Sequence, residues 1–108
     1  MVSQTIMLYC VSLFVVSIDM ALYEFYGKTC PHCIEMMPIV DKLIGEGIPI
    51  EKFEVWDDKD NAAKMEEANK NHCPGVPFFV NTKSDQWICG STNEATLRDW
   101  AAGKPIEH

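Results

Sequence analysis

The pattern of apolar and polar residues along the chain predicts four short strands and three helices. Strands are indicated where apolar, aromatic or β-branched side chains cluster between turn residues. Helices are indicated where apolar residues recur every three or four positions. We therefore expect strands at residues 21–26, 48–56, 78–80 and 86–89, and helices at residues 34–44, 61–71 and 95–102.

The helix expected at residues 34–44 has the clearest pattern. Its apolar residues follow helical spacing: Ile34, Met37, Val40, Leu43 and Ile44. Pro31 suits the first helical turn, where a missing N–H costs nothing, and Thr29 is a candidate N-cap. Pro38 is expected to kink the helix, and the glycines of residues 45–47 end it.

The remaining elements complete one small α/β domain. Residues 81–85 have the composition of a hairpin turn, and residues 91–94 match a capping box before the last helix. The order is β-α-β-α-β-β-α, which indicates a mixed four-stranded sheet flanked by helices. We place this domain at residues 20–108 and treat residues 1–19 as an apolar leader.

The leader carries no charged side chain before Asp19, and three interpretations of it remain open. A secretory signal normally has a basic start and a small-residue cleavage site, and neither is evident here. A membrane-spanning helix needs about 20 apolar residues, which this segment reaches only marginally. We favour an extra strand or a dispensable extension and expect a cytoplasmic protein, with export or membrane anchoring as the alternative.

Composition narrows the range of partners. The chain has 108 residues and a net charge of −7, so it is long enough for one small domain and lacks the basic surface of a nucleic-acid-binding protein. Its five cysteines are odd in number and are not spaced like a disulfide framework. A purely structural set of bridges is therefore disfavoured.

Cys30 and Cys33 form a Cys-x-x-Cys motif between an expected strand and an expected helix, with Pro31 and His32 inside it. This is the layout of a dithiol redox centre. The N-terminus of a helix favours an anion, so we expect Cys30 to attack as a thiolate and Cys33 to resolve the mixed disulfide. The alternative is half of a zinc or iron–sulfur site, which needs a second close pair of ligands.

Four features together resemble the thioredoxin superfamily over residues 20–103. They are the lead-in at residues 24–26, which is similar to that of protein disulfide isomerase domains, the motif at residues 30–33, the proline at position 38, and residues 75–77 before an apolar strand. The resemblance implies a thioredoxin-like fold and a thiol–disulfide oxidoreductase. It implies no required metal or organic cofactor, and a reductase or glutathione that recycles the dithiol.

The resemblance also implies roles for individual residues. By this resemblance, Glu24 is the buried acid that exchanges a proton with Cys33, and Lys52 on the next strand pairs with Glu24. The bond between Val76 and Pro77 becomes cis and faces Cys30, so that Val76 backbone groups can pair with an extended substrate. A trans bond and a solvent-facing Glu24 are the alternatives.

His32 has two interpretations. It is either an ordinary exposed histidine at the start of a helix or a group that favours the Cys30 thiolate and thus stabilises the reduced form. We favour the second interpretation.

Other features resemble glutaredoxins, namely the compact length and Thr29 before the first cysteine. The glutaredoxin Gly-Gly-x-Asp signature is replaced here by residues 89–93. The helix start at Thr92, with Lys28, remains a candidate site for a glutathione carboxylate. The expected partners are thus protein or glutathione disulfides and thiols, bound by a monomer.

Three cysteines and the tryptophans remain. Cys73 is either a second redox thiol or a partly buried small hydrophobe, and we favour the latter. Cys10 and Cys89 are expected to be structural. We expect the tryptophans in core or edge packing: Trp56, Trp87 and Trp100. The alternative function for the whole chain is a non-catalytic binding module, or a metal or iron–sulfur carrier that uses Cys30.

Overall fold

The computed structural model describes residues 21–108, and the leader at residues 1–19 lies outside this range. A four-stranded sheet with the strand order β3-β2-β4-β5 forms its centre. The strands are β2 (Leu22–Tyr26), β3 (Ile50–Glu54), β4 (Phe78–Asn81) and β5 (Gln86–Cys89). β2 runs parallel to β3 and antiparallel to β4, and β4 and β5 form an antiparallel hairpin. The expected mixed sheet is confirmed.

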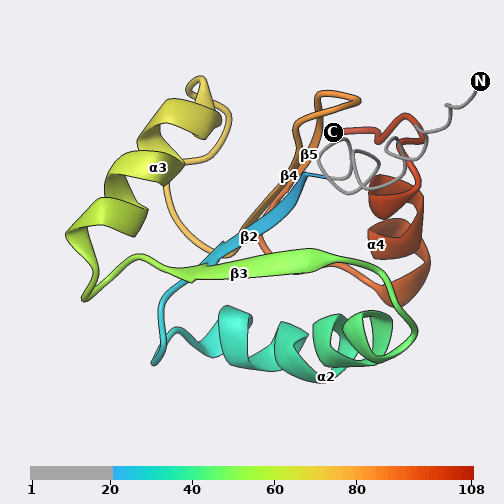
Figure 1. Ribbon diagram of the computed structural model, residues 1–108, viewed down its shortest axis with the longest axis horizontal. Helices are drawn as coiled ribbons and strands as arrows, with labels where there is room; N and C mark the ends of the chain where they lie inside the picture. The colour runs from blue at the N-terminus through green and yellow to red at the C-terminus, as the bar shows by residue number, and fades with distance from the viewer. Residues whose placement is uncertain (1–20) are drawn as a thin grey trace, which may run out of the picture.

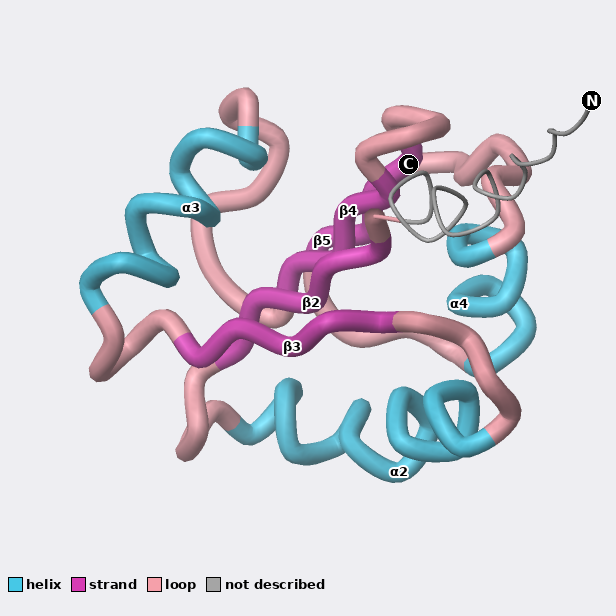
Figure 2. Tube along the Cα trace, in the orientation of Figure 1, coloured by secondary structure: helices cyan, strands magenta, loops and turns pink. Residues whose placement is uncertain are grey.

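Three helices cover the two faces of this sheet (Figure 1). They are α2 (Pro31–Gly45), α3 (Lys59–Asn69) and α4 (Glu94–Ala101). α2 and α4 lie on one side of the sheet and α3 lies on the other. The observed order, β-α-β-α-β-β-α, is the predicted one (Figure 2).

Alternation along β2 divides the apolar core into two clusters, because successive strand residues point to opposite faces. Leu22 and Glu24 point toward the α2 and α4 side, whereas Phe25 belongs to the α3 side. The first cluster is formed by buried residues of the sheet, α2 and α4: Leu22, Met36, Val40, Leu43, Ile50, Phe79, Ile88, Leu97 and Trp100. The second is formed by Phe25, Cys73, Phe78 and Val80, with half-buried residues of α3 packed against it.

Two predicted helix caps are wrong. The N-cap of α2 is Cys30 rather than Thr29, since the Cys30 sulfur accepts the Cys33 N–H. The N-cap of α4 is Asn93 rather than Ser91, and its Oδ1 accepts the Thr96 N–H at 2.8 Å. Both true caps lie closer to the first helical residue, where a side-chain acceptor reaches the orphan N–H groups directly. None of the helices within residues 21–108 has the length and apolar character needed to cross a bilayer.

Candidate active site

Three loops meet at the end of the sheet where β2 and β3 end (Figure 1). They connect β2 to α2, β3 to α3, and α3 to β4. The Lys28 N–H donates to Glu54 Oε2 at 3.2 Å, which joins the first loop to the end of β3. The Cys30 sulfur lies 3.7 Å from the Val76 carbonyl oxygen, which joins the first loop to the third. The fold therefore brings the predicted dithiol and the predicted substrate loop together.

Cys30 occupies the position where the chain turns from loop into helix. Its backbone is extended, and its carbonyl accepts the Ile34 N–H at 2.9 Å, which begins α2. The Cys33 N–H donates to the Cys30 sulfur at 3.3 Å. A free thiol group at this place receives a hydrogen bond from the helix terminus, which favours negative charge there.

Cys33 is also free and is almost completely buried, with 1% of its surface exposed. The Gly27 N–H donates to its sulfur at 3.5 Å. Burial raises the pKa of the Cys33 thiol well above its usual range, and the hydrogen bond with the Cys30 thiol adds to this. Cys33 is therefore protonated at neutral pH and needs a proton acceptor before it can attack.

Glu24 is the buried acid next to Cys33. Its side chain is 2% exposed, and its Oε1 atom has no hydrogen-bond partner among residues 21–108. Burial raises its pKa to about 7, because an apolar environment disfavours the charged form. The charge of Glu24 in turn helps to raise the pKa of Cys33. A carboxyl group that titrates near neutrality beside a protonated thiol is suited to proton transfer.

The expected ion pair between Glu24 and Lys52 is not formed. The two residues are register neighbours across β2 and β3, as their strand positions imply. However, the Lys52 ammonium donates to Asp41 Oδ1 of α2 at 3.3 Å. Lys52 still lowers the pKa of Glu24, but burial outweighs this effect and the Asp41 charge opposes it. A direct ion pair with Lys52 would keep Glu24 ionised, whereas the observed arrangement leaves its pKa raised.

The peptide bond between Val76 and Pro77 is cis, which is the isomer expected from the resemblance. Pro77 is buried and Val76 is half-buried. The Pro77 carbonyl accepts the Gly90 N–H at 2.7 Å, so the start of β4 is held by the end of β5. The Val76 carbonyl, in contrast, faces the Cys30 sulfur.

Three predicted site residues make contacts outside the dithiol and outside a glutathione site: His32, Lys28 and Thr92. The His32 ring is exposed, and its Nδ1 lies 3.3 Å from Glu35 Oε1 rather than against a sulfur. Lys28 forms an ion pair with Asp57. The Thr92 N–H donates to the Met36 sulfur at 3.3 Å. Among residues 21–108 no contact joins Lys28 to Thr92, and a shared role in binding glutathione remains a prediction.

Trp56 is an exposed residue beside the site, although the sequence suggests core or edge packing. Its side chain is 54% exposed and lies over Gly27, where an added Cβ would come within 2.3 Å of the indole ring. Gly27 is also the residue whose N–H meets the Cys33 sulfur. Ile34, directly after Cys33, is 50% exposed. Apolar surface therefore borders the dithiol.

Cys73 is buried, as expected, but its pairing with Cys89 was not expected. They form a disulfide, with 5.4 Å between their Cα atoms and a sequence separation of 16. Their pairing depends on the hairpin, because Cys89 is the register partner of Phe78 and Cys73 precedes β4. Two cysteines that flank a predicted hairpin were the signal for this bridge. Cys10 lies outside the described residues.

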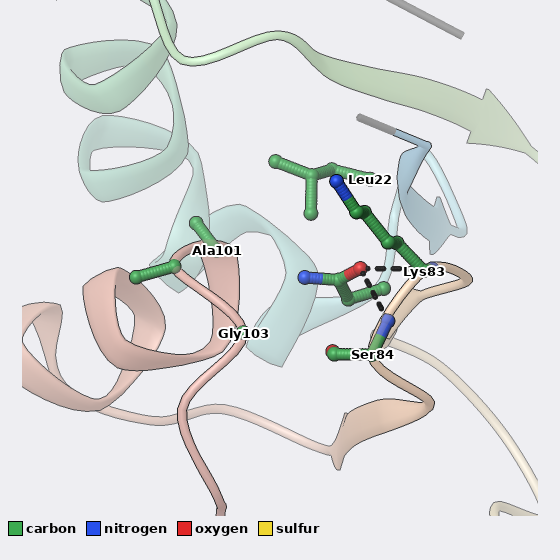
Figure 3. A pocket seen from close by; sticks show the side chains of 7 residues that line it. Leu22, Lys83, Ser84, Ala101 and Gly103 are labelled. Carbon is green, nitrogen blue, oxygen red and sulfur yellow. Dashed lines mark hydrogen bonds between the residues drawn. The ribbon is translucent and has the colours of Figure 1, made fainter. Parts of the chain in front are cut away.

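A cavity lies away from the Cys30/Cys33 site, beside the β4–β5 hairpin (Figure 3). It has a volume of about 420 Å³ and is lined by residues of the β4–β5 hairpin, β2 and the end of α4. Asn81 lies in its wall, where its Oδ1 accepts the N–H groups of Lys83 and Ser84 and its Nδ2 donates to the Trp100 carbonyl. The polar groups of the Asn81 side chain thus form hydrogen bonds within the protein rather than facing a ligand in the cavity. In the described part of the chain, no three His, Cys, Asp or Glu side chains are grouped to hold a metal ion.

Comparison with known proteins shows a likeness in fold. No protein-family model matches the chain, and no curated protein matches it. Among solved structures, the glutaredoxin (grx-1) of Archaeoglobus fulgidus superposes with a TM-score of 0.53 at 18% sequence identity. The match covers 82% of this chain and 91% of that one. The chain thus has a thioredoxin-like fold, and its activity has to be argued from its own residues.

Proposed function

We propose that this protein is a thiol–disulfide oxidoreductase that works through Cys30 and Cys33. The observation that carries the proposal is the pair of free cysteines at the start of α2. The Cys33 N–H donates to the Cys30 sulfur. The pKa of the Cys33 thiol is raised, and the Glu24 carboxyl group that contributes to this shift has a pKa of about 7. The glutaredoxin-like fold supports a redox function in general terms.

The proposed reaction has two exchange steps. The Cys30 thiolate attacks one sulfur of a substrate disulfide, a mixed disulfide forms, and the second substrate sulfur leaves as a thiolate. Cys33 then loses its proton to Glu24 and attacks the Cys30 sulfur. The substrate sulfur leaves as a thiolate, and a Cys30–Cys33 disulfide remains. Two electrons have passed to the substrate, and glutathione or a dithiol reductase then supplies two electrons that reduce the Cys30–Cys33 disulfide and is itself oxidised to a disulfide.

Extended polypeptide disulfides are the proposed substrates. The Val76 carbonyl next to Cys30 offers a hydrogen-bond acceptor to an extended chain, in the manner of strand addition. Trp56 and Ile34 offer exposed apolar surface near the dithiol. Glutathione is the less supported substrate, because the Lys28 ammonium is already paired with Asp57.

Trapping of a mixed disulfide tests the proposed function. Cys33→Ser keeps the nucleophile but removes the resolving thiol, so it should accumulate a covalent adduct with insulin that a reducing gel dissolves. Cys30→Ser is the matched control and should form none at this site, because the remaining Cys33 is 1% exposed and its raised pKa keeps the thiol protonated. Mass spectrometry locates the adduct. Equal adduct formation by both variants, or adducts on neither, contradicts the assignment.

Replacing His32 by tyrosine or proline is expected to lower the reduction potential of the Cys30/Cys33 couple. A protonated ring near the start of α2 favours the reduced, thiolate form, and its loss removes that preference. A tenfold change in the equilibrium corresponds to about 30 mV, which is the expected size. Titration in glutathione redox buffers measures it.

Glu35→Gln is the control for this experiment, since Glu35 is the carboxylate that faces the His32 ring. Removing that negative charge leaves the histidine free to act on the dithiol, so the potential should rise or stay constant. A potential that does not respond to either His32 variant contradicts the tuning role.

A further inference from the structure

A disulfide lies outside the Cys30/Cys33 site and ties the substrate loop to the sheet. It joins Cys73, in the loop between α3 and β4, to Cys89 at the end of β5. Cys73 is buried, whereas Cys89 is exposed. An external thiol therefore has access to the bridge from the Cys89 side.

Two further contacts, at Cys73 and at the residue before it, hold this loop. The Asn69 side chain accepts the Cys73 N–H at 2.8 Å and donates to the Cys73 carbonyl at 2.5 Å. The His72 ring stacks on Trp87 of β5 with 4.3 Å between ring centroids. The bridge adds a covalent link to these weaker contacts.

The same loop positions the proposed substrate acceptor. Val76 follows Cys73 by three residues, and its carbonyl is the group that faces the Cys30 sulfur. On the other side of the bridge, Gly90 follows Cys89 and donates to the Pro77 carbonyl. The Cys73–Cys89 bond and the Gly90–Pro77 hydrogen bond therefore enclose the segment that contains Val76.

We infer that the Cys73–Cys89 disulfide is a second redox site, and that its reduction by a thiol loosens the Val76 loop and weakens turnover of polypeptide disulfides. The part that concerns turnover rests on the proposed function. Loop segments with few fixed contacts open at low energy cost, so removing a covalent anchor should shift this loop toward open states.

The reduction is a balanced exchange. A low-molecular-weight thiolate attacks the exposed Cys89 sulfur, the bridge breaks, and Cys73 leaves as a thiolate that takes a proton. The Cys73 sulfur lies 3.1 Å from the Gly75 carbonyl oxygen, so the new thiol has an acceptor in place. A second thiolate attacks the outer sulfur of the mixed disulfide, which releases Cys89 as a thiolate and the reductant as its disulfide.

The first experiment needs no enzymatic activity. Amide hydrogen exchange of residues 72–77 is compared between closed and opened bridges in a Cys10→Ser, Cys30→Ser, Cys33→Ser background, where no other thiols react. Peptide mapping first verifies that the closed sample contains the cross-linked pair. Exchange is expected to rise about tenfold on treatment with dithiothreitol, and to be equally fast with Cys73→Ala and Cys89→Ser at any redox state.

Asn69→Ala is the matched control for this experiment. It removes the hydrogen-bond clamp and leaves the disulfide, so exchange should rise moderately and should respond further to dithiothreitol. Failure of the bridge to form, or exchange that is unchanged by its reduction, overturns the inference.

The second experiment uses protein in which Cys30 and Cys33 are retained, and it compares the turnover of two substrates. In the Cys73→Ala and Cys89→Ser double variant, kcat/KM for insulin is expected to fall about tenfold, while kcat/KM for bis(2-hydroxyethyl) disulfide stays constant, because only a polypeptide pairs with Val76. An equal fall for both substrates, or none, overturns the inference. Absence of turnover by the unmodified protein instead refutes the proposed function, and the exchange experiment then decides the inference alone.

Discussion

Replacing Glu24 by glutamine is expected to raise the free energy of unfolding at pH 8 by about 3 kcal/mol. Burial raises the pKa of Glu24 to about 7 from an ordinary value of 4.5. Between these two values the folded protein holds a proton that the unfolded chain has lost. The free energy of unfolding therefore falls as the pH rises across this range, and the loss is complete above about pH 7. Glutamine removes the cost because it carries no charge.

Urea unfolding between pH 4 and pH 8 measures this effect. The two proteins should be about equally stable near pH 4, and the difference should grow between about pH 4.5 and pH 7 and then level off toward pH 8. Glu51→Gln, at an exposed position of β3, controls for the loss of a negative charge elsewhere on the sheet. Asp41→Asn should lower the pKa of Glu24, because the Asp41 charge raises it. A constant difference across the whole pH range contradicts the buried titration.

The same substitution should slow the second exchange step. Cys33 needs a proton acceptor, and glutamine cannot take the proton, so the mixed disulfide should resolve more slowly while the attack by Cys30 is largely intact. General acid–base groups typically contribute about 10² to 10⁴ in rate. Rapid-quench measurement of the mixed disulfide checks this. A resolution rate in the unmodified protein that does not change between pH 6 and pH 8 refutes the role.

Glu24 therefore links stability to function. An isolated buried carboxylate has no structural advantage, since its Oε1 atom has no hydrogen-bond partner within the part of the chain that the structure describes. Its persistence in an otherwise apolar core is explained if the reaction needs a group that titrates near pH 7 beside Cys33. Such a group costs stability at neutral pH because burial disfavours its charged form, whereas the unfolded chain ionises freely.

The fold and the dithiol follow from local sequence signals. The strand at Leu22–Tyr26 and the helix from Pro31 onward are set by apolar spacing and by a proline that suits a first turn. Cys30 and Cys33 are separated by two residues, so the start of a helix brings their backbone and sulfur atoms together without any distant contact.

The remaining features depend on which distant segments meet. Lys52 lies opposite Glu24 in the strand register, but its long side chain reaches more than one acceptor. It pairs with the exposed Asp41 of α2, because the ammonium group loses less of its hydration there than beside the buried Glu24. Cys73 and Cys89 meet only because the hairpin returns β5 to the loop before β4. Residue spacing along the chain therefore does not predict the Lys52–Asp41 ion pair or the Cys73–Cys89 disulfide.

Removing the Cys73–Cys89 disulfide should lower the free energy of unfolding by about 3 kcal/mol, which is the loop-entropy estimate for a closed loop of about 15 residues. The bridge closes a segment with a sequence separation of 16, and it restricts the unfolded chain more than the folded one. The comparison uses Cys73→Ala and Cys89→Ser together. Alanine keeps the buried Cys73 position apolar, and serine suits the exposed Cys89 position.

Urea unfolding in the Cys30→Ser and Cys33→Ser background measures this loss free of the first redox couple. Dithiothreitol should reduce the stability of the bridged protein to that of the bridge-free variant, and should leave the variant unchanged, because the entropy of the unfolded chain depends only on whether the bridge is closed. If the oxidised protein is no more stable than the variant, the bridge does not constrain the unfolded state. A role for it in stability is then excluded, and only its local effect on the Val76 loop would remain to be tested by exchange.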